Sequence, residues 1–193
     1  MGALRSFFVL GANCTQFLFF GGFMKKDVRR ITHAAIIAAA YVVLTSLQYA
    51  LLPETVSGMI QFRASEALCV LAFFTPAAIP GLGIGCFLFN ITSSAVLPFD
   101  FLVGSLASLL AAWSMWKTRS CTVKGFPLLG MLFPALTNGI LVGAELAICI
   151  GGGFWLNAIY VAIGEVAVLL TLGSVLYATL GRKELQSQLF DRP

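Results

Sequence analysis

Long apolar segments follow one another through most of this sequence, and each has about the length that a helix needs to cross a bilayer. Hydrophobic residues make up 59% of the 193 residues and charged residues only 10%, whereas a soluble domain has about 25% charged residues. No aqueous core of this size would bury so much apolar surface, so the chain must fold with lipid as its solvent. At about 20 residues for each span, the length predicts about six spans and leaves no room for a sizeable soluble domain.

We therefore expect an all-α membrane protein whose fold is a bundle of six transmembrane helices. Loops are expected where proline, glycine or charged residues interrupt the apolar segments. Residues 24–181 then form one membrane domain, and residues 182–193 form a polar tail. The expected spans are residues 31–52, 60–74, 81–97, 101–116, 127–150 and 155–180.

Residues 1–23 form an apolar segment that we interpret separately. It contains one basic residue, Arg5, and lacks a small-residue cleavage site, so a signal peptide fits poorly. Met24 directly precedes Lys25 and Lys26, as expected of a true start. We predict that residues 1–23 result from a mis-set start. A seventh helix, lying in the interface or spanning the membrane, is the alternative.

Basic residues gather before the first expected span, between the fourth and fifth spans, and after the sixth. With six spans, all three clusters fall on the same side of the membrane. The expected loops after spans one, three and five contain no lysine or arginine. Because cytoplasmic loops carry an excess of lysine and arginine, we expect both termini to be cytoplasmic.

One arginine, Arg63, lies within an expected span together with an acid, Glu66. A charge at the centre of a bilayer costs about 2.5–3.5 kcal/mol on insertion scales, so such residues indicate a polar cavity, a mutual pair or a site near the interface. Arg63 and Glu66 are three residues apart and would share a face of a helix. They are expected either to form an ion pair that only orients the helix, or to belong to a small-molecule site in which Arg63 orients Glu66.

Further polar residues lie mostly in the half of the bundle that is expected to face outward. Asn138 and Glu145 share a face of the fifth span, and Asn157 and Tyr160 share a face of the sixth, which also contains Glu165. Each could instead make an interhelical hydrogen bond that only stabilises the bundle. Together, so many acids around one arginine favour a small cationic ligand rich in hydrogen-bond donors. The predicted binding residues are Arg63, Glu66, Asp100, Asn138, Glu145, Asn157, Tyr160 and Glu165.

Small residues in the first and third expected spans recur at a spacing that allows helices to approach closely. Gly81 and Gly85 are four residues apart in the third span, and we interpret them as a packing motif. The first span carries a similar stripe of alanines, which predicts a docking face for another helix. The stripe consists of Ala34, Ala35, Ala38 and Ala39.

Several kinds of chemistry are excluded by what the sequence lacks. It contains no G-x-x-x-x-G-K-[ST] loop to hold the phosphates of ATP. Its single histidine, His33, leaves no histidine pair, and no spacing of cysteines suggests a metal site. We therefore expect a protein that is not an enzyme and that uses no cofactor or metal.

Five motifs follow one another between residues 24 and 180. They are Phe62-Arg-x-Ser-Glu-Ala-Leu68, Phe73-Phe-Thr-Pro-x-Ala-Ile-Pro-Gly-Leu82, Asp100-Phe-x-x-Gly-Ser-Leu-Ala107, Asn138-Gly-x-x-Val-Gly-x-Glu-Leu146 and Asn157-Ala-x-x-Val-x-x-Gly-Glu165. In this order they resemble the queuosine-precursor transporter family (QueT). Residues 1–23 fall outside the resemblance.

The resemblance implies a substrate-binding (S) subunit of an energy-coupling factor transporter in a bacterial plasma membrane. Members of that family are six-helix bundles with both ends inside. They work with a membrane coupling subunit and two cytoplasmic ATPase subunits, and their first helix contacts the coupling subunit through an Ala-x-x-x-Ala stripe. The implied ligand is a queuosine precursor, either queuine or a 7-deazaguanine such as its aminomethyl form, preQ1, and no nucleic acid is expected to bind.

Three other classes of function remain open at this stage. The first is a stand-alone secondary transporter of a small polar metabolite, driven by an ion gradient. Such a protein would need intramembrane acids along the whole path and usually has internal repeats, whereas the acids here lie mostly in the outer half. The second class is a membrane enzyme, and the third is a structural or assembly subunit.

Overall fold

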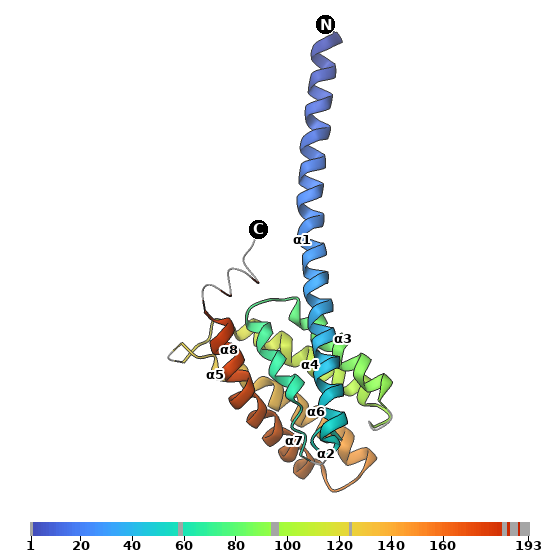
Figure 1. Cartoon of the computed structure of the whole chain (residues 1–193), viewed down its shortest axis with the longest axis vertical. Coiled ribbons are helices and arrows are strands. Elements are labelled where there is room, and N and C mark those ends of the chain that lie inside the picture. Colours follow the sequence, from blue (N-terminus) through green and yellow to red (C-terminus); the bar gives the residue numbers. More distant parts are fainter. Residues whose placement is uncertain are drawn as a thin grey trace.

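The computed structural model is helical throughout most of the residues that it describes (Figure 1). It describes the backbone of residues 2–57, 60–93, 97–123 and 125–182 with residues 185 and 189, and side chains from Asp27 onward except that of residue 57. The side chains of residues 1–23 and of most of the tail at 182–193 lie outside the described set. The mis-set start and the polar tail therefore stay predictions. The first half of the chain forms α1 (Gly2–Leu51), α2 (Pro53–Ser57), the 3-10 helix η1 (Ala64–Phe73) and α3 (Ala78–Thr92).

The second half of the chain begins with a single long helix, α4 (Asp100–Thr118). A short helix, α5 (Leu128–Met131), precedes α6 (Phe133–Cys149), so the fifth expected span is interrupted near its start. The sixth expected span is continuous but changes its hydrogen bonding in the middle. It consists of α7 (Phe154–Val168), the π-helical turn η2 (Leu169–Gly173) and α8 (Ser174–Leu180).

Each of the six expected spans coincides with a helical segment, and the all-α prediction is confirmed. Among the residues that the structure describes, three segments are long and apolar enough to cross a membrane, namely Asp27–Leu51, Leu128–Cys149 and Phe154–Leu180. η1 and α3 are shorter apolar helices of 10 and 15 residues, which at roughly 2.0 and 1.5 Å per residue reach less than the ~30 Å of a hydrocarbon core. The count of six complete crossings stays a prediction.

Two expected boundaries were wrong. The second span was expected to be helical from residue 60, but the helix begins only at Ala64, because Arg63 has an extended backbone with φ −77° and ψ 106°. The third was expected to reach residue 97, but α3 ends at Thr92 and Ser93 is extended. In both places the chain leaves the helix beside the polar site described below.

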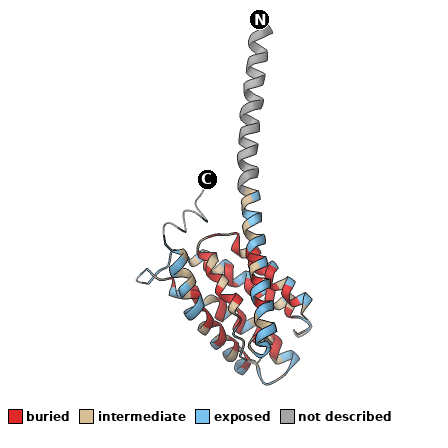
Figure 2. Cartoon of the chain, in the orientation of Figure 1, coloured by how far each residue is buried: buried red, intermediate tan, exposed pale blue. Residues whose placement is uncertain are grey.

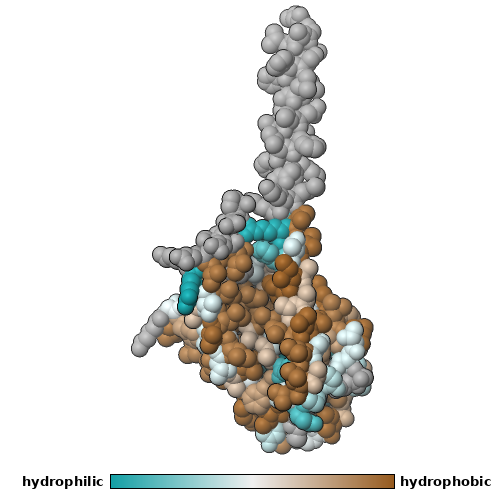
Figure 3. Space-filling model, in the orientation of Figure 1, coloured by the Kyte–Doolittle hydropathy of each residue, from teal (hydrophilic) through white to brown (hydrophobic). Residues whose placement is uncertain are grey.

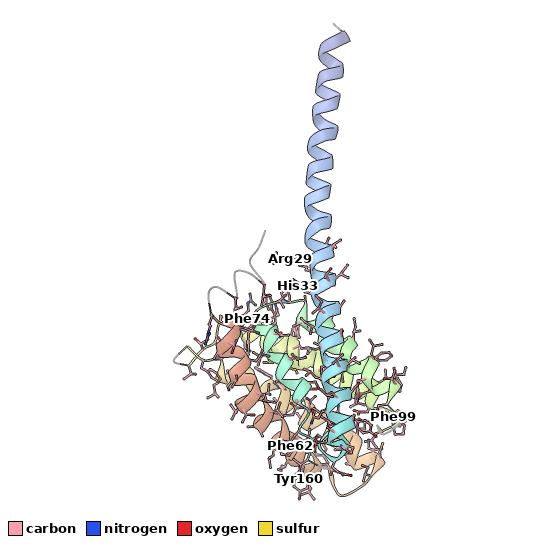
Figure 4. The ribbon with its side chains drawn as sticks, in the orientation of Figure 1. Arg29, His33, Phe62, Phe74, Phe99 and Tyr160 are labelled. Carbon is pink, nitrogen blue, oxygen red and sulfur yellow. The ribbon has the colours of Figure 1, made fainter. Side chains whose placement is uncertain are left out.

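The middle of α1 and the C-terminal part of the chain meet at one end of the bundle. Arg29 of α1 donates a hydrogen bond from Nη2 to the carbonyl oxygen of Leu189, at 3.2 Å. Figure 4 places Arg29 and His33 at this end, and Phe62, Phe99 and Tyr160 toward the opposite end. This arrangement agrees with the prediction that the basic clusters lie on one side of the membrane. The assignment of that side to the cytoplasm stays a prediction.

The surface of the bundle is suited to lipid. Figure 3 shows a face that is mostly hydrophobic, with hydrophilic residues gathered mainly near the end where α1 enters. Large apolar side chains are widely exposed, including Ile148 at 81% and Trp155 at 76%. The buried residues line the inner sides of the helices (Figure 2). Their apolar core contains Tyr41, Leu82, Met115 and Leu169.

α1 and α3 approach so closely that glycine is needed between them. A Cβ added to Gly81 would lie 2.8 Å from the carbonyl oxygen of Ala34. A Cβ added to Gly85 would lie 2.7 Å from Cβ of Tyr41 and 3.0 Å from the carbonyl oxygen of Ala38. The prediction that Gly81 and Gly85 form a packing motif is therefore confirmed, and their partner is the alanine stripe of α1.

The substitution Gly85→Ala tests this close approach. Alanine raises helix propensity by about 1 kcal/mol, but here the methyl group meets atoms fixed to the backbone of α1, and overpacking costs about 1–3 kcal/mol. We expect Gly85→Ala to lower the melting temperature in detergent.

Gly83→Ala in the same helix is the matched control. Its methyl group would lie 2.6 Å from Cγ and Cδ2 of Leu109, so it meets a side chain and not the backbone of a neighbouring helix, and Leu109 is 36% exposed and can move aside. Its melting temperature should stay at or above that of the wild type. Equal stability of the two variants would contradict the account of the α1–α3 contact.

Candidate functional site

An ion pair lies between the start of η1 and the start of α4. Arg63 Nη2 and Asp100 Oδ2 are 3.1 Å apart, and both side chains are buried. Arg63 Nε also donates to the carbonyl oxygen of Val56 in α2, at 3.4 Å. Asp100 is the first residue of α4, where a negative charge is stabilised by the helix dipole.

The expectation that Arg63 pairs with or orients Glu66 was therefore wrong. It assumed that the two residues lie on one regular helix. Arg63 instead precedes the helix in an extended conformation, and its side chain reaches Asp100 on α4. The ion pair thus joins two segments that are far apart in the sequence.

Glu66 is held by two neighbours from different helices. The hydroxyl of Tyr41 donates to its Oε1 at 2.6 Å, and Cys69 Sγ donates to its Oε2 at 3.2 Å. Glu66 is only 2% exposed. Since an ionised carboxylate has about four acceptor positions, these two bonds leave acceptor capacity on both oxygens.

Glu165 of α7 is bonded on one side only. Asn138 of α6 donates from Nδ2 to Glu165 Oε1 at 2.5 Å. Glu165 Oε2 is buried and has no hydrogen-bond partner among the described residues. Asn138 thus makes an interhelical hydrogen bond from α6 to α7, which was the alternative to a binding role for this residue.

Glu145 is a second acid of α6 with unused acceptors. Both of its carboxylate oxygens are buried without a hydrogen-bond partner in the described part of the chain, as is Asp100 Oδ1. Its charge faces the beginning of α4, at Phe99 and Asp100. A buried acceptor without a donor costs about 1–3 kcal/mol or more, so these oxygens are suited to receive donors from a ligand.

Two neighbouring cavities meet at Arg63. The larger has a volume of about 130 Å³, and its polar lining includes Tyr49, Gln61, Arg63 and Asp100. The smaller, at about 10 Å³, has room for one water molecule. The two share Gln61, Arg63 and Val142 as lining residues. The lining of the smaller cavity also contains Glu66, Ser108, Asn138 and Glu165.

Both cavities belong to the half of the bundle away from Arg29. Figure 4 shows Phe62 and Phe99, the sequence neighbours of Arg63 and Asp100, toward that end. The site is also strongly acidic. Among the described residues, four buried carboxylates surround a single buried guanidinium, that of Arg63. They are Glu66, Asp100, Glu145 and Glu165.

Three of the predicted binding residues line neither cavity, namely Glu145, Asn157 and Tyr160. Asn157 donates from Nδ2 to the carbonyl oxygen of Gly151, at 2.9 Å, and so fixes the glycine loop between α6 and α7. Tyr160 is half-buried near the same end of the bundle. Neither residue lines either cavity. Both are on the first turns of α7, whereas Glu165 lies deeper along that helix.

Sequence reasoning missed several polar residues of the site, including Tyr49 and Ser93 in the lining of the larger cavity. Gln61 lines both cavities, Ser108 lines the smaller one, and Tyr41 bonds Glu66. Gln61 could have been found, because it directly precedes the Phe62 motif in an apolar stretch. Ser108 and Tyr41 carried no such signal, since a serine or tyrosine in a span is common and only the packing gives it a partner.

The ion pair can be tested by a double-mutant cycle on stability. Arg63→Gln leaves Asp100 buried without its charge partner, and Asp100→Asn does the same to Arg63. Each single change should cost about 3–5 kcal/mol. The double variant should lose clearly less than the sum, because it buries no unpaired charge. Thermal unfolding in detergent measures all three variants, and strictly additive losses would show that the pair does not act as a unit.

Comparison with known proteins identifies the family of this chain. The family model of the QueT transporter matches residues 31–182, which is more than half of the chain. The queuosine precursor transporter QueT of Lactococcus lactis subsp. cremoris (strain MG1363) is 40% identical over 86 residues, covering 45% of this chain. The aligned part spans 48%, or about half, of that relative. No solved structure matches the chain. By the match over residues 31–182, the chain belongs to the QueT transporter family.

Proposed function

We propose that this chain is the substrate-binding subunit of an energy-coupling factor transporter that imports a queuosine precursor, queuine or a 7-deazaguanine such as preQ1. Membership of the QueT transporter family supports import of such a ligand. The printed name of the Lactococcus relative supports the same ligand class. The observation that carries the proposal is the set of buried carboxylate oxygens without donors on Asp100, Glu145 and Glu165.

The chemistry of a 7-deazaguanine matches these acceptors. Its guanine-like edge presents two parallel N–H donors, which one carboxylate accepts together. The aminomethyl group of preQ1 is a cation near neutral pH and pairs with a second carboxylate. Hydrogen bonds to charged groups contribute about 1.5–3 kcal/mol each, so three or four of them support nanomolar affinity, near −12 kcal/mol.

The two cavities suggest how the ligand lies. Gln61 and Arg63 form the boundary between them, so a small movement of these side chains joins the spaces into one pocket. Either the base or the amine of the ligand then reaches Glu66 and Glu165, which line the smaller cavity. The other end of the ligand stays near Asp100 and Glu145. Arg63 offsets part of the negative charge through Asp100.

Transport requires partner subunits, because the sequence has no ATP-binding loop. An apolar groove of about 770 Å³ between α1 and α3 is suited to receive a helix of the membrane coupling subunit. Ala35 and Ala39 in this groove are exposed, whereas Ala38 is buried against α3. Two cytoplasmic ATPase subunits then supply the energy. The groove is lined by Arg30, Ile31, Ala34, Ala35, Ala38, Ala39, Pro76, Ala77, Pro80, Ile84 and Leu88.

The acids are tested by changing each to its amide. Glu66→Gln, Glu145→Gln and Glu165→Gln keep the shape but replace an acceptor with a donor. Loss of one charge-assisted bond should weaken binding by roughly ten- to hundredfold. Calorimetric titration with preQ1 and with the same base lacking the amine measures the effect.

The pattern across the two ligands identifies the role of each acid. A change at the acid that binds the guanine-like edge should weaken both ligands alike, and a change at the amine partner should weaken only preQ1. Glu54→Gln, in the exposed helix α2, is the control and should keep wild-type affinity. Wild-type affinity in all three site variants would show that these acids only stabilise the bundle.

The docking groove is tested by placing a bulky side chain in it. Ala35→Trp and Ala39→Trp fill the groove from exposed positions, so they should block assembly with the coupling subunit and leave preQ1 affinity nearly unchanged. Co-purification of the co-expressed subunits measures assembly. Ile36→Trp is the matched control, since Ile36 is 61% exposed and lies outside the groove lining.

Two results would contradict this part of the proposal. If Ala35→Trp and Ala39→Trp still assemble, the docking face is elsewhere on the bundle. If the chain alone accumulates preQ1 in proteoliposomes under an ion gradient, it is a secondary transporter and needs no coupling subunit.

A further inference from the structure

Tyr41 contacts the acidic site without lining either of its cavities. It lies on α1, is completely buried and lines neither cavity. Its hydroxyl nevertheless donates to Glu66 Oε1 at 2.6 Å, a length typical of a charge-assisted O–H···O bond. Glu66 itself lines the smaller cavity. Tyr41 therefore acts on the site through Glu66 and not by contact with the ligand.

The position of Tyr41 is fixed by its surroundings. Gly85 of α3 leaves no space at the Tyr41 Cβ, because an added Cβ would lie only 2.7 Å away. One turn further along α1, Thr45 is fully buried and donates from Oγ1 to the carbonyl oxygen of Tyr41, at 2.8 Å. A side chain held in this way has one available orientation, so its hydroxyl is a rigid donor.

Two donors then define the orientation of the Glu66 carboxylate. Tyr41 bonds Oε1, and Cys69 of η1 bonds Oε2. A thiol is a weak donor compared with a phenol, so the Tyr41 bond dominates. The remaining acceptor positions of Glu66 are left for the cavity. Without the phenol, the glutamate would sample several rotamers and lose this freedom again when a ligand binds.

We propose that Tyr41 is the positioning residue of the site, which holds Glu66 in the orientation that accepts donors of the ligand. This inference rests on the proposed function, because it concerns the same ligand. It also makes α1 part of the binding machinery. The helix whose alanines form the docking groove then fixes an acid of the ligand site, three residues after Ala38.

The test begins with Tyr41→Phe, which removes only the hydroxyl and keeps the ring that fills the space between α1 and α3. Calorimetric titration with preQ1 should show affinity weakened roughly tenfold, as expected for one lost charge-assisted bond. Cys69→Ala removes the weaker donor and should have a smaller effect in the same direction. Tyr177→Phe is the matched control, because it removes a tyrosine hydroxyl from a ring that packs against Phe73 and Phe126 and lines neither cavity, and its affinity should match the wild type.

A second measurement separates positioning from a general structural role. In a Glu66→Ala background, Tyr41→Phe should have no further effect on preQ1 affinity, because the side chain that Tyr41 orients has been removed. Wild-type affinity in Tyr41→Phe would overturn the inference, and so would an equal loss in both backgrounds. If Tyr41→Phe does not fold, 4-fluorophenylalanine at position 41 fills the space of the hydroxyl without donating a hydrogen bond, and wild-type affinity in that variant overturns the inference. Failure of the wild type to bind preQ1 would instead overturn the proposed function, and the inference with it.

Discussion

A buried guanidinium in an apolar bundle is stable only beside a carboxylate, and the ion pair of Arg63 and Asp100 meets this requirement. The pair joins the start of η1 to the start of α4, and its Arg63 lines both cavities. The ion pair also neutralises the positive charge of Arg63. The acids Glu66, Glu145 and Glu165 are therefore left without a basic partner among the described residues, and the proposed ligand, which is cationic and rich in donors, would compensate for this.

The packing of the bundle explains how these acids come together. Glycines of α3 let α1 approach closely, which brings Tyr41 to Glu66. α6 and α7 pack in the same manner, since a Cβ on Gly143 would lie 2.7 Å from Cα of Ala158. This close contact accompanies the bond from Asn138 to Glu165. Small residues thus determine the geometry of the polar site as well as the fold.

Much of the fold could be predicted from the sequence, because lipid leaves few alternatives to apolar helices. Local patterns predicted the helical segments, the packing role of Gly81 and Gly85, and the acidic character of the site. The partner of Arg63 could not be predicted in this way. A spacing of three residues suggests a shared helical face only if the helix is regular, and here the chain is extended at Arg63 and 3-10 helical afterwards. Asn157 and Tyr160 likewise lie apart from the cavities because they are near the start of α7. The sequence pattern showed that they share a face of this helix, but not how far along the helix the cavities lie.

The central claim is that the acidic cavity binds a 7-deazaguanine cation. The most direct measurement is mass spectrometry of the ligand that the wild-type chain retains after purification from cells supplied with preQ1 and queuine. The account predicts a queuosine precursor at a stoichiometry near one per chain. Retention of an anionic or apolar compound in place of both precursors would contradict it, and so would recovery of the chain without any purine-like ligand.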